Sequence, residues 1–302
     1  MFLCIVIALE DAAMHDDKTG AYAKRFNQVF DYIEHHLDRT ILLEQLCEVA
    51  KFSPYHFHRQ FSSYCGMPVG RYIQLMRLKH ASYRLVFNPL EKIIDIALDV
   101  GFQNPESFSR AFKQVFGLTP SQFRQKPAWV AWSQCIPEPK RIRTQTMKVS
   151  IVNFPATAVA MLAHRGQSER LNETAARFIE WRKTTGLSPV RTSQTYGIAP
   201  HDPLTTKPDD FRFDICGSVD ALIPEDNPFG VINGIIPAGR CAVVRHHGSH
   251  CSLTESARYL YRDWLPTSGE ELRDFPMYFH YFNFVHEVAI HELLTDIYLP
   301  LK

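Results

Sequence analysis

Two arginines occupy matching positions in a pattern that occurs twice in the chain. Arg59 and Arg110 each lie between two phenylalanines that are four residues apart, and the second copy follows the first by 51 positions. The flanking residues are Phe57, Phe61, Phe108 and Phe112. A guanidinium can donate two hydrogen bonds to O6 and N7 of guanine. The pattern therefore indicates contact with a repeating partner, of which duplex DNA is the obvious example.

Histidine-rich stretches contain residue types that bind zinc. In His246-His247-x-x-His250-Cys251 the adjacent histidines would point to opposite faces of a strand. His286 and His291 are five residues apart, whereas a zinc-binding helix needs histidines at i and i+4. The spacing predicts no metal site. The chain also lacks a G-x-S-x-G, P-loop or dinucleotide motif, so no cofactor is expected.

Helices must position the two arginines. Phenylalanines at i and i+4 share one helix face, and the arginine between them points elsewhere. Ser53-Pro54 and Asn104-Pro105 are typical helix starts, which predicts helices over 54–64 and 105–116. Shorter helices are expected before them, over 42–50, with Thr40 as its cap, and over 92–100. The first half of the chain is thus predicted to be an all-α double helix-turn-helix domain.

A longer helix is expected over 69–86, between the two units. At about 1.5 Å per residue it would span roughly 27 Å. One turn of B-DNA is about 34 Å. A helix of this length could place the two arginine-bearing helices in successive major grooves on one side of the duplex.

The charge and composition support two domains of different character. The chain has 302 residues, of which 45% are hydrophobic and 22% charged. Residues 14–126 contain 15 Lys and Arg against 11 Asp and Glu, whereas residues 127–302 contain 18 against 19. We expect a start over 1–20 that is unstructured or begins at Met14, a DNA-binding domain over 21–126, a proline-containing linker over 127–146 and a second domain over 147–302. Seven cysteines without a C-x-x-C pair, and no segment long enough to cross a membrane, favour the cytoplasm.

A long motif includes the second arginine-bearing helix and extends to both sides of it. It reads Ile96-Ala97-x-x-x-Gly101-Phe102, Phe108-x-Arg110-x-Phe112-Lys113 and Phe116-Gly117-x-Thr119-Pro120-x-x-Phe123-Arg124. With it, residues 25–125 resemble the DNA-binding domain of the bacterial AraC/XylS family. The resemblance implies a transcriptional activator or repressor that binds promoter DNA and works with RNA polymerase. Carried onto matching positions, it implies DNA contacts by Tyr55, His58, Arg59, Glu106, Ser107, Ser109 and Arg110.

Other roles remain open for individual basic residues. Arg59 could instead form a salt bridge to the preceding helix. Four further residues are candidates for phosphate contacts or plain solvated surface: Lys51, Arg71, Arg77 and Lys113.

A spacing of 82 residues recurs in the second half. His164 and His246, and Tyr196 and Tyr278, are pairs on this register. Each copy has the pattern of a strand (159–164; 242–247), a glycine, a loop, a helix (171–183; 253–264) and further strands. Two such strand–helix–strand–strand units predict one pseudo-two-fold α+β domain. A groove shared by both halves would be a natural small-molecule site.

The second half also carries a set of motifs: His246-x-Gly248, Tyr259, Asp263-Trp264-Leu265-Pro266-x-Ser268-Gly269, Pro276, Tyr281-x-Asn283 and the ending Thr295-Asp296-Ile297-Tyr298-Leu299-Pro300-Leu301. With them, residues 147–301 resemble the gyrase-inhibitor-like effector-binding domain of the right-origin-binding-protein group. The resemblance implies an aromatic groove that binds small molecules, often hydrophobic cations, beside an acidic residue. The candidate effector contacts are Trp181, Tyr196, Tyr259, Tyr278, Phe279 and Tyr281.

The sequence departs from this family where Phe279 takes the place of the usual buried Glu. Three interpretations follow. The ligand is neutral or anionic, which we favour. Otherwise another acid (Asp214, Asp296 or Glu255) pairs with a cationic ligand, or the domain binds no small molecule. The second half could alternatively be a hydrolase or sequestering module, or a protein-interaction domain of an architectural DNA-binding protein. No nucleophile–base pair is evident, so we expect no enzymatic activity.

Overall fold

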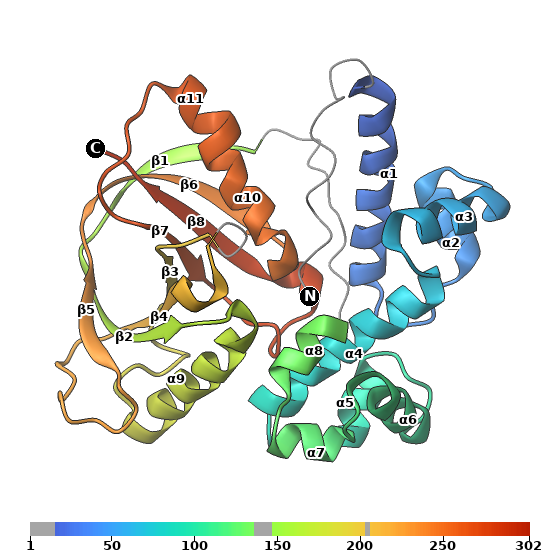
Figure 1. Ribbon diagram of the computed structural model, residues 1–302, viewed down its shortest axis with the longest axis horizontal. Coiled ribbons are helices and arrows are strands. Elements are labelled where there is room, and N and C mark those ends of the chain that lie inside the picture. The colour runs from blue at the N-terminus through green and yellow to red at the C-terminus, as the bar shows by residue number, and fades with distance from the viewer. Residues whose placement is uncertain (1–15, 136–146, 203–205) are drawn as a thin grey trace.

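The computed structural model describes residues 16–135, 147–202 and 206–302. Helices make up one half of the molecule, and a single sheet with covering helices makes up the other (Figure 1). This arrangement confirms the predicted fold class, an all-α domain followed by an α+β domain. Residues 1–15 of the expected unstructured start lie outside the described residues, and residues 16–20 already belong to the first helix.

The helical domain contains eight described helices. They are α1 (Asp16–His35), α2 (Leu43–Ala50), α3 (Pro54–Cys65), α4 (Val69–Phe87), α5 (Ile93–Asp99), α6 (Pro105–Phe116), α7 (Pro120–Gln125) and α8 (Trp129–Cys135). The pairs α2–α3 and α5–α6 are the two helix-turn-helix units, and α4 joins them (Figure 1).

Local sequence signals set most of the helix ends. Proline occupies the first turn of α3 and α6, where its missing N–H costs no hydrogen bond. Gly66 and Gly117 end these helices with φ of 71° and 72°, a left-handed conformation that favours glycine. The expected cap of α2 was wrong. Leu42, not Thr40, is the N-cap, and its backbone N–H donates to the Gln45 side chain over 2.9 Å.

One hydrophobic core holds both helix-turn-helix units together. The four repeated phenylalanines have no exposed surface, as their spacing predicts: Phe57, Phe61, Phe108 and Phe112. Along α4, Tyr72, Leu78 and Leu85 are buried in the same cluster. The connecting helix is therefore packed on both units and cannot act as a loose tether.

The beginning of the predicted linker is part of this core. Trp129 and Trp132 of α8 are buried, and the Trp129 ring centre lies 5.4 Å from that of Phe123. Residues 127–146 were expected to form a linker because of their prolines. The apolar face of α8 instead extends the helical domain to residue 135, and residues 136–146 lie outside the described part of the chain.

The second domain is built on an antiparallel sheet of eight strands in the order β1-β6-β8-β7-β3-β4-β2-β5. The strands are β1 (Val149–Phe154), β2 (Thr157–Arg165), β3 (Thr195–Ala199), β4 (Arg212–Ser218), β5 (Ile232–Ile236), β6 (Gly239–His247), β7 (Met277–Tyr281) and β8 (Leu294–Pro300). Helix α9 (Leu171–Thr185) covers one half of the sheet. The other half is covered by α10 (Leu253–Tyr259), a π-helical turn (Leu260–Trp264) and α11 (Leu265–Ser268).

The strand bounds repeat with a separation of 82 residues. β2 and β6, β3 and β7, and β4 and β8 each begin and end 82 positions apart. The sheet order is accordingly mirrored about the central pair β3–β7. Each half also starts with a strand that the sequence pattern did not show. β1 pairs with β6 and β5 pairs with β2, so each half contributes its first strand to the other half.

A loop of the sheet domain packs into the helical core. This loop, residues 282–293, connects β7 to β8. Its Ile290 and Leu293 are buried in the same cluster as the repeated phenylalanines. The Asn88 side chain donates to the His286 backbone oxygen over 2.8 Å, and the rings of His35 and His291 stack at 4.2 Å. We call these contacts the domain junction.

Acid should weaken the domain junction because two half-buried histidines lie there: His286, and His80 of α4, which hydrogen-bonds to the backbone of Val285. Burial lowers the pKa of His80 and of His286 to about 4, whereas both would titrate near 6.5 in the unfolded chain. Below pH 6.5 the unfolded chain therefore binds protons that the folded chain excludes. The free energy of unfolding should fall between about pH 6.5 and pH 4, by up to about 1.4 kcal/mol per pH unit for each histidine.

Urea denaturation at a series of pH values measures this dependence. His80→Asn should flatten it, whereas His56→Asn, at an exposed position of α3, should leave it unchanged. The assignment fails if the His80→Asn variant loses stability in acid as steeply as the parent protein.

Candidate DNA-binding surface and effector groove

The outer face of α3 is polar and carries an exposed aromatic ring. Tyr55, His58 and Arg59 are all exposed, and Tyr55 keeps 66% of its surface accessible. The Arg59 guanidinium donates to the Tyr55 hydroxyl over 3.2 Å and lies 5.9 Å from the centre of its ring. These contacts keep the guanidinium on the outer face, where a nucleic acid could reach it.

The outer face of α6 presents a different set of groups. Glu106 and Arg110 are exposed, and Ser107 and Ser109 are half-buried. The Ser107 hydroxyl donates to the Asn104 backbone oxygen over 2.8 Å, so its proton is used within the first turn of the helix. Arg110 Nε has only a long contact of 3.4 Å to the Glu106 carbonyl. All seven predicted DNA contacts thus lie on the outer faces of α3 and α6.

Neither Arg59 nor Arg110 has an acidic partner within the described ranges. Within these ranges, Arg59 does not form the alternative salt bridge to the preceding helix. The 19 residues of α4 separate the two units, which is about 28 Å at about 1.5 Å per residue. Two unneutralised guanidiniums are thus carried by one packed domain, on units joined by a helix somewhat shorter than one turn of DNA.

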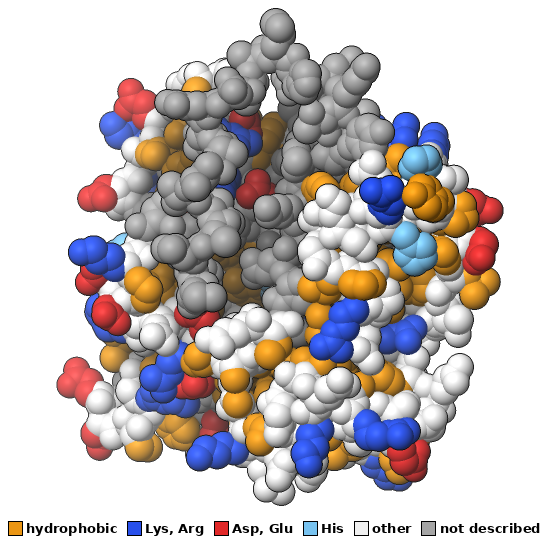
Figure 2. Space-filling view, turned by 45° about the vertical axis from the view of Figure 1, so that its right-hand side comes forward, with side chains coloured by type: hydrophobic (Ala, Val, Ile, Leu, Met, Phe, Trp, Pro, Cys, Tyr) orange, Lys and Arg blue, Asp and Glu red, His pale blue; other side chains and the backbone are white. Residues whose placement is uncertain are grey.

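The other basic candidates divide into two groups. Lys51, Arg71 and Lys113 are exposed, and Figure 2 shows Lys and Arg side chains spread over the helical face that comes forward. Arg77 instead turns inward and donates to the backbone oxygens of Leu37 at 2.9 Å and Arg39 at 2.5 Å. Its primary role is therefore to tie α4 to the loop that follows α1.

The six aromatic residues predicted for an effector groove lie on two sides of the sheet. Successive side chains alternate along a strand. Phe279 and Tyr281 pack with residues of α10, whereas Tyr278 packs with Tyr196 on the opposite face, with ring centres 6.4 Å apart. Tyr196 and Tyr278 therefore do not share a groove with the others. The two remaining residues are buried under or within the covering helices: Trp181 and Tyr259.

Aromatic rings cover the backbone at the centre of the sheet. Gly197 of β3 pairs with Phe279 of β7, and a side chain at Gly197 would lie 2.4 Å from the Phe213 ring and 3.2 Å from the Tyr281 ring. Phe279 is only 9% exposed. A ligand that reached the backbone of Gly197 would have to displace the Phe213 ring. Sequence reasoning missed Gly197 and Phe213, although the 82-residue register pairs Gly197 with Phe279 and could have revealed the first.

The acids that could replace the family's glutamate already have arginine partners. Asp214 accepts hydrogen bonds from Arg212 at 2.8 and 2.7 Å, and Asp296 accepts from Arg245 at 2.7 and 2.8 Å. Strand alternation places both carboxylates on the face opposite Phe279. The third candidate, Glu255, lies 3.5 Å from Arg258. None of the three acids is therefore free to neutralise a cation beside Phe279.

The two histidines of the 82-residue register have equivalent structural roles. His164 and His246 are buried, and Nε2 of each ring lies 3.0 or 3.1 Å from a backbone oxygen, that of Gln167 or Ser249. A carbonyl only accepts, so Nε2 carries the proton. Nδ1 then accepts from a helix hydroxyl at 2.8 Å, from Thr174 and Ser256. Each ring thus ties a strand to its covering helix.

Two further properties concern metal ions and membranes. No cluster of three or more His, Cys, Asp or Glu side chains in the described part of the chain could hold a metal ion. None of the described helices combines the length and apolar character that crossing a bilayer requires.

Known proteins match both halves of the chain. A profile of the GyrI-like small molecule binding domain matches residues 147–302, and a profile of a helix-turn-helix domain matches residues 46–126. The probable transcriptional regulator YgiV of Escherichia coli (strain K12) is 51% identical over 156 residues, or 52% of this chain and 97% of that protein. The right origin-binding protein of the same strain is 29% identical over 187 residues, or 59% of this chain and 63% of that protein.

The crystal structure of the EcmrR C-terminal domain is among the solved structures that the chain matches. It aligns with a TM-score of 0.44 at 20% identity and covers 52% of this chain and 99% of that domain. The profile match over 147–302 and the near-complete coverage of YgiV confirm the resemblance of the second half. The chain belongs to the family of proteins with a GyrI-like small molecule binding domain, here preceded by a helix-turn-helix domain.

Proposed function

We propose that this protein is a transcription regulator that binds duplex DNA through α3 and α6 and responds to a small molecule. The observation that carries the proposal is a pair of exposed arginines, Arg59 and Arg110, at matching positions on two helices of one packed domain, with no acidic partner among the described residues. The helix-turn-helix profile and the names of the relatives, a probable transcriptional regulator and a right origin-binding protein, support it.

DNA recognition would divide between the two recognition helices. Arg59 and Arg110 can each pair with a guanine, while Tyr55, His58 and Ser109 can reach phosphates or base edges. Glu106 can only accept, so it would favour cytosine N4. Promoter DNA as the target and RNA polymerase as a partner follow from the family resemblance, as does a cytoplasmic location.

The effector would bind between α9 and α10, over the central strands β3 and β7. Asp214, Asp296 and Glu255 are paired with arginines, so none of these three acids is available to a cation there. A neutral aromatic molecule fits better, since it could replace the ring of Phe213 or Tyr281 over Gly197. We assign no catalytic role, because both nitrogens of His164 and His246 are already engaged.

The domain junction supplies a route between the two sites. β7 carries Phe279 and Tyr281 and continues directly into the loop 282–293. That loop contributes Ile290 and Leu293 to the core that positions α3 and α6. Displacement of a β7 ring by an effector would therefore act on the packing of the helical domain.

Replacing either arginine should weaken DNA binding in a way that depends on sequence. If Arg59 reads a base, Arg59→Ala should cost about 1–3 kcal/mol at one base pair and relax the preference there. Arg110→Ala should do the same at a second position about one helical turn away, or weaken all sequences equally if it contacts only phosphate. Anisotropy titrations with promoter fragments over a range of salt concentrations measure both effects.

The control for these titrations is Arg262→Ala, in the exposed π-helical turn of the sheet domain, which should bind DNA as the parent protein does. Binding without a salt slope and without sequence preference would contradict the proposal. Binding with a salt slope but no preference would favour an architectural DNA-binding protein.

Restoring an acid at the centre of the sheet should restore cation binding. Phe279→Glu would place a carboxylate beside the rings of Phe213 and Tyr281, where few other groups could pair with it. A lipophilic aromatic cation should then bind at least about tenfold more tightly than to the parent protein, a gain of about 1.4 kcal/mol. Calorimetric titration measures it. Phe279→Gln has a similar shape without the charge, and equal cation affinity of the two variants would refute the assignment.

A further inference from the structure

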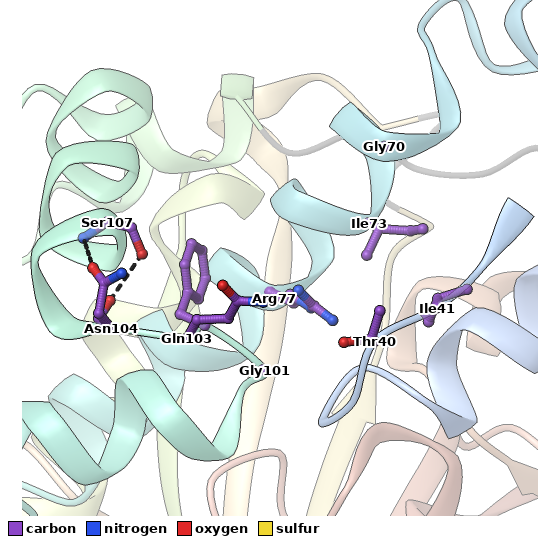
Figure 3. A pocket seen from close by; sticks show the side chains of 10 residues that line it. Thr40, Ile41, Gly70, Ile73, Arg77, Gly101, Gln103, Asn104 and Ser107 are labelled. Atoms are coloured by element: carbon purple, nitrogen blue, oxygen red, sulfur yellow. Dashed lines mark hydrogen bonds between the residues drawn. The ribbon is translucent and has the colours of Figure 1, made fainter.

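A cleft separates the two helix-turn-helix units. It has a volume of about 450 Å³ and is lined from three sides, by the loop before α2, by one face of α4 and by the turn that starts α6 (Figure 3). The residues that matter for its chemistry are Thr40, Gly70, Arg77, Gln103, Asn104 and Ser107. Ser107 belongs also to the predicted DNA contacts of α6, so the cleft is continuous with that surface.

The cleft carries one positive charge that no lining residue neutralises. The Arg77 guanidinium extends toward Thr40 (Figure 3), and its hydrogen bonds go to the carbonyls of Leu37 and Arg39, not to an acid. Asp38 interacts with Arg77 through its charge, but it lies outside the lining of the cleft, in an exposed pair with Arg39 at 3.4 Å. Among the described residues that line the cleft there is no Asp or Glu. A guanidinium has five N–H groups, so Arg77 retains donors beyond those used on the two carbonyls.

The other polar groups of the cleft are neutral hydrogen-bond donors. Asn104 Oδ1 accepts from the Ser107 backbone N–H at 2.8 Å, which leaves the amide nitrogen of Asn104 free to donate. Thr40 and Gln103 add a hydroxyl and a second amide. One fixed positive charge surrounded by neutral donors suits a phosphate diester, which bears one negative charge and accepting oxygens.

We propose that this cleft binds a phosphate of the DNA backbone between the two major grooves that α3 and α6 enter. The inference rests on the proposed function, because a duplex that spans both helices must pass α4 between them. The phosphate would fix the register of the duplex on the protein without reading sequence. Arg77 then has two roles, since it braces the loop after α1 and supplies the charge of the cleft.

Gly70 allows a test that leaves the existing contacts intact. It lines the cleft, and a side chain added to its Cα would meet no atom within 4 Å. Gly70→Glu should repel the phosphate, lower DNA affinity about tenfold and make the slope of log K against log salt shallower by about one. Gly70→Gln has nearly the same shape without the charge and should keep the parent's slope, and Gly70→Lys should bind more tightly than the parent.

The loss caused by Gly70→Glu should be equal for specific and random duplexes, because phosphate contacts carry no sequence information. If Gly70→Glu binds DNA with the affinity and the salt slope of the parent protein, the cleft proposal is wrong. The Arg59 and Arg110 variants test DNA binding itself. A second arm compares thermal stability in sodium phosphate and in chloride at equal ionic strength. If phosphate stabilises the parent but not Gly70→Glu, and both bind DNA equally, the cleft holds a free anion and the assignment to DNA is wrong.

Discussion

The burial of α4 is the constraint on which the DNA-binding surface depends. Because Tyr72, Leu78 and Leu85 lie in the core shared with both phenylalanine pairs, α4 cannot rotate or bend without breaking that core. The separation of Arg59 and Arg110 is therefore a property of packing, not of a linker. The same burial sets the width of the cleft between the units, since α4 forms one of its sides.

Arginines have two distinct roles in the helical domain, which differ in the hydrogen-bond acceptors available to each side chain. Arg84 is held by Glu91 and Asp99, and Arg124 donates to the backbone oxygens of Leu85 at 3.1 Å and Glu91 at 2.7 Å. These side chains stabilise the framework. Arg59 and Arg110 have no acidic partner in the part of the chain that the structure describes, and both stay on the surface. A bound phosphate or guanine would supply the acceptors that the protein itself does not provide to them.

The strands of the sheet domain are symmetric, but the residues at the centre of the sheet are not. The exchange of β1 and β5 makes each half depend on the other, and the matching bonds of His164 and His246 brace both helices in the same way. At the axis, however, Gly197 faces Phe279. Because Gly197 has no side chain, the rings of Phe213 from one half and Tyr281 from the other lie over it. The proposed effector would bind at this asymmetric centre, on a scaffold that is symmetric in its strands.

Short-range signals in the sequence were enough to determine the paired helices, their proline starts at Pro54 and Pro105, and the 82-residue register of the strands. Such features depend on neighbours within one or two turns, or on a repeat visible in the chain itself. Tertiary structure alone decided that α8 joins the core, that Arg77 turns inward, that Tyr196 and Phe279 lie on opposite sides of the sheet, and that Ile290 reaches the helical domain. Each of these depends on partners tens to hundreds of residues away, which no local pattern encodes.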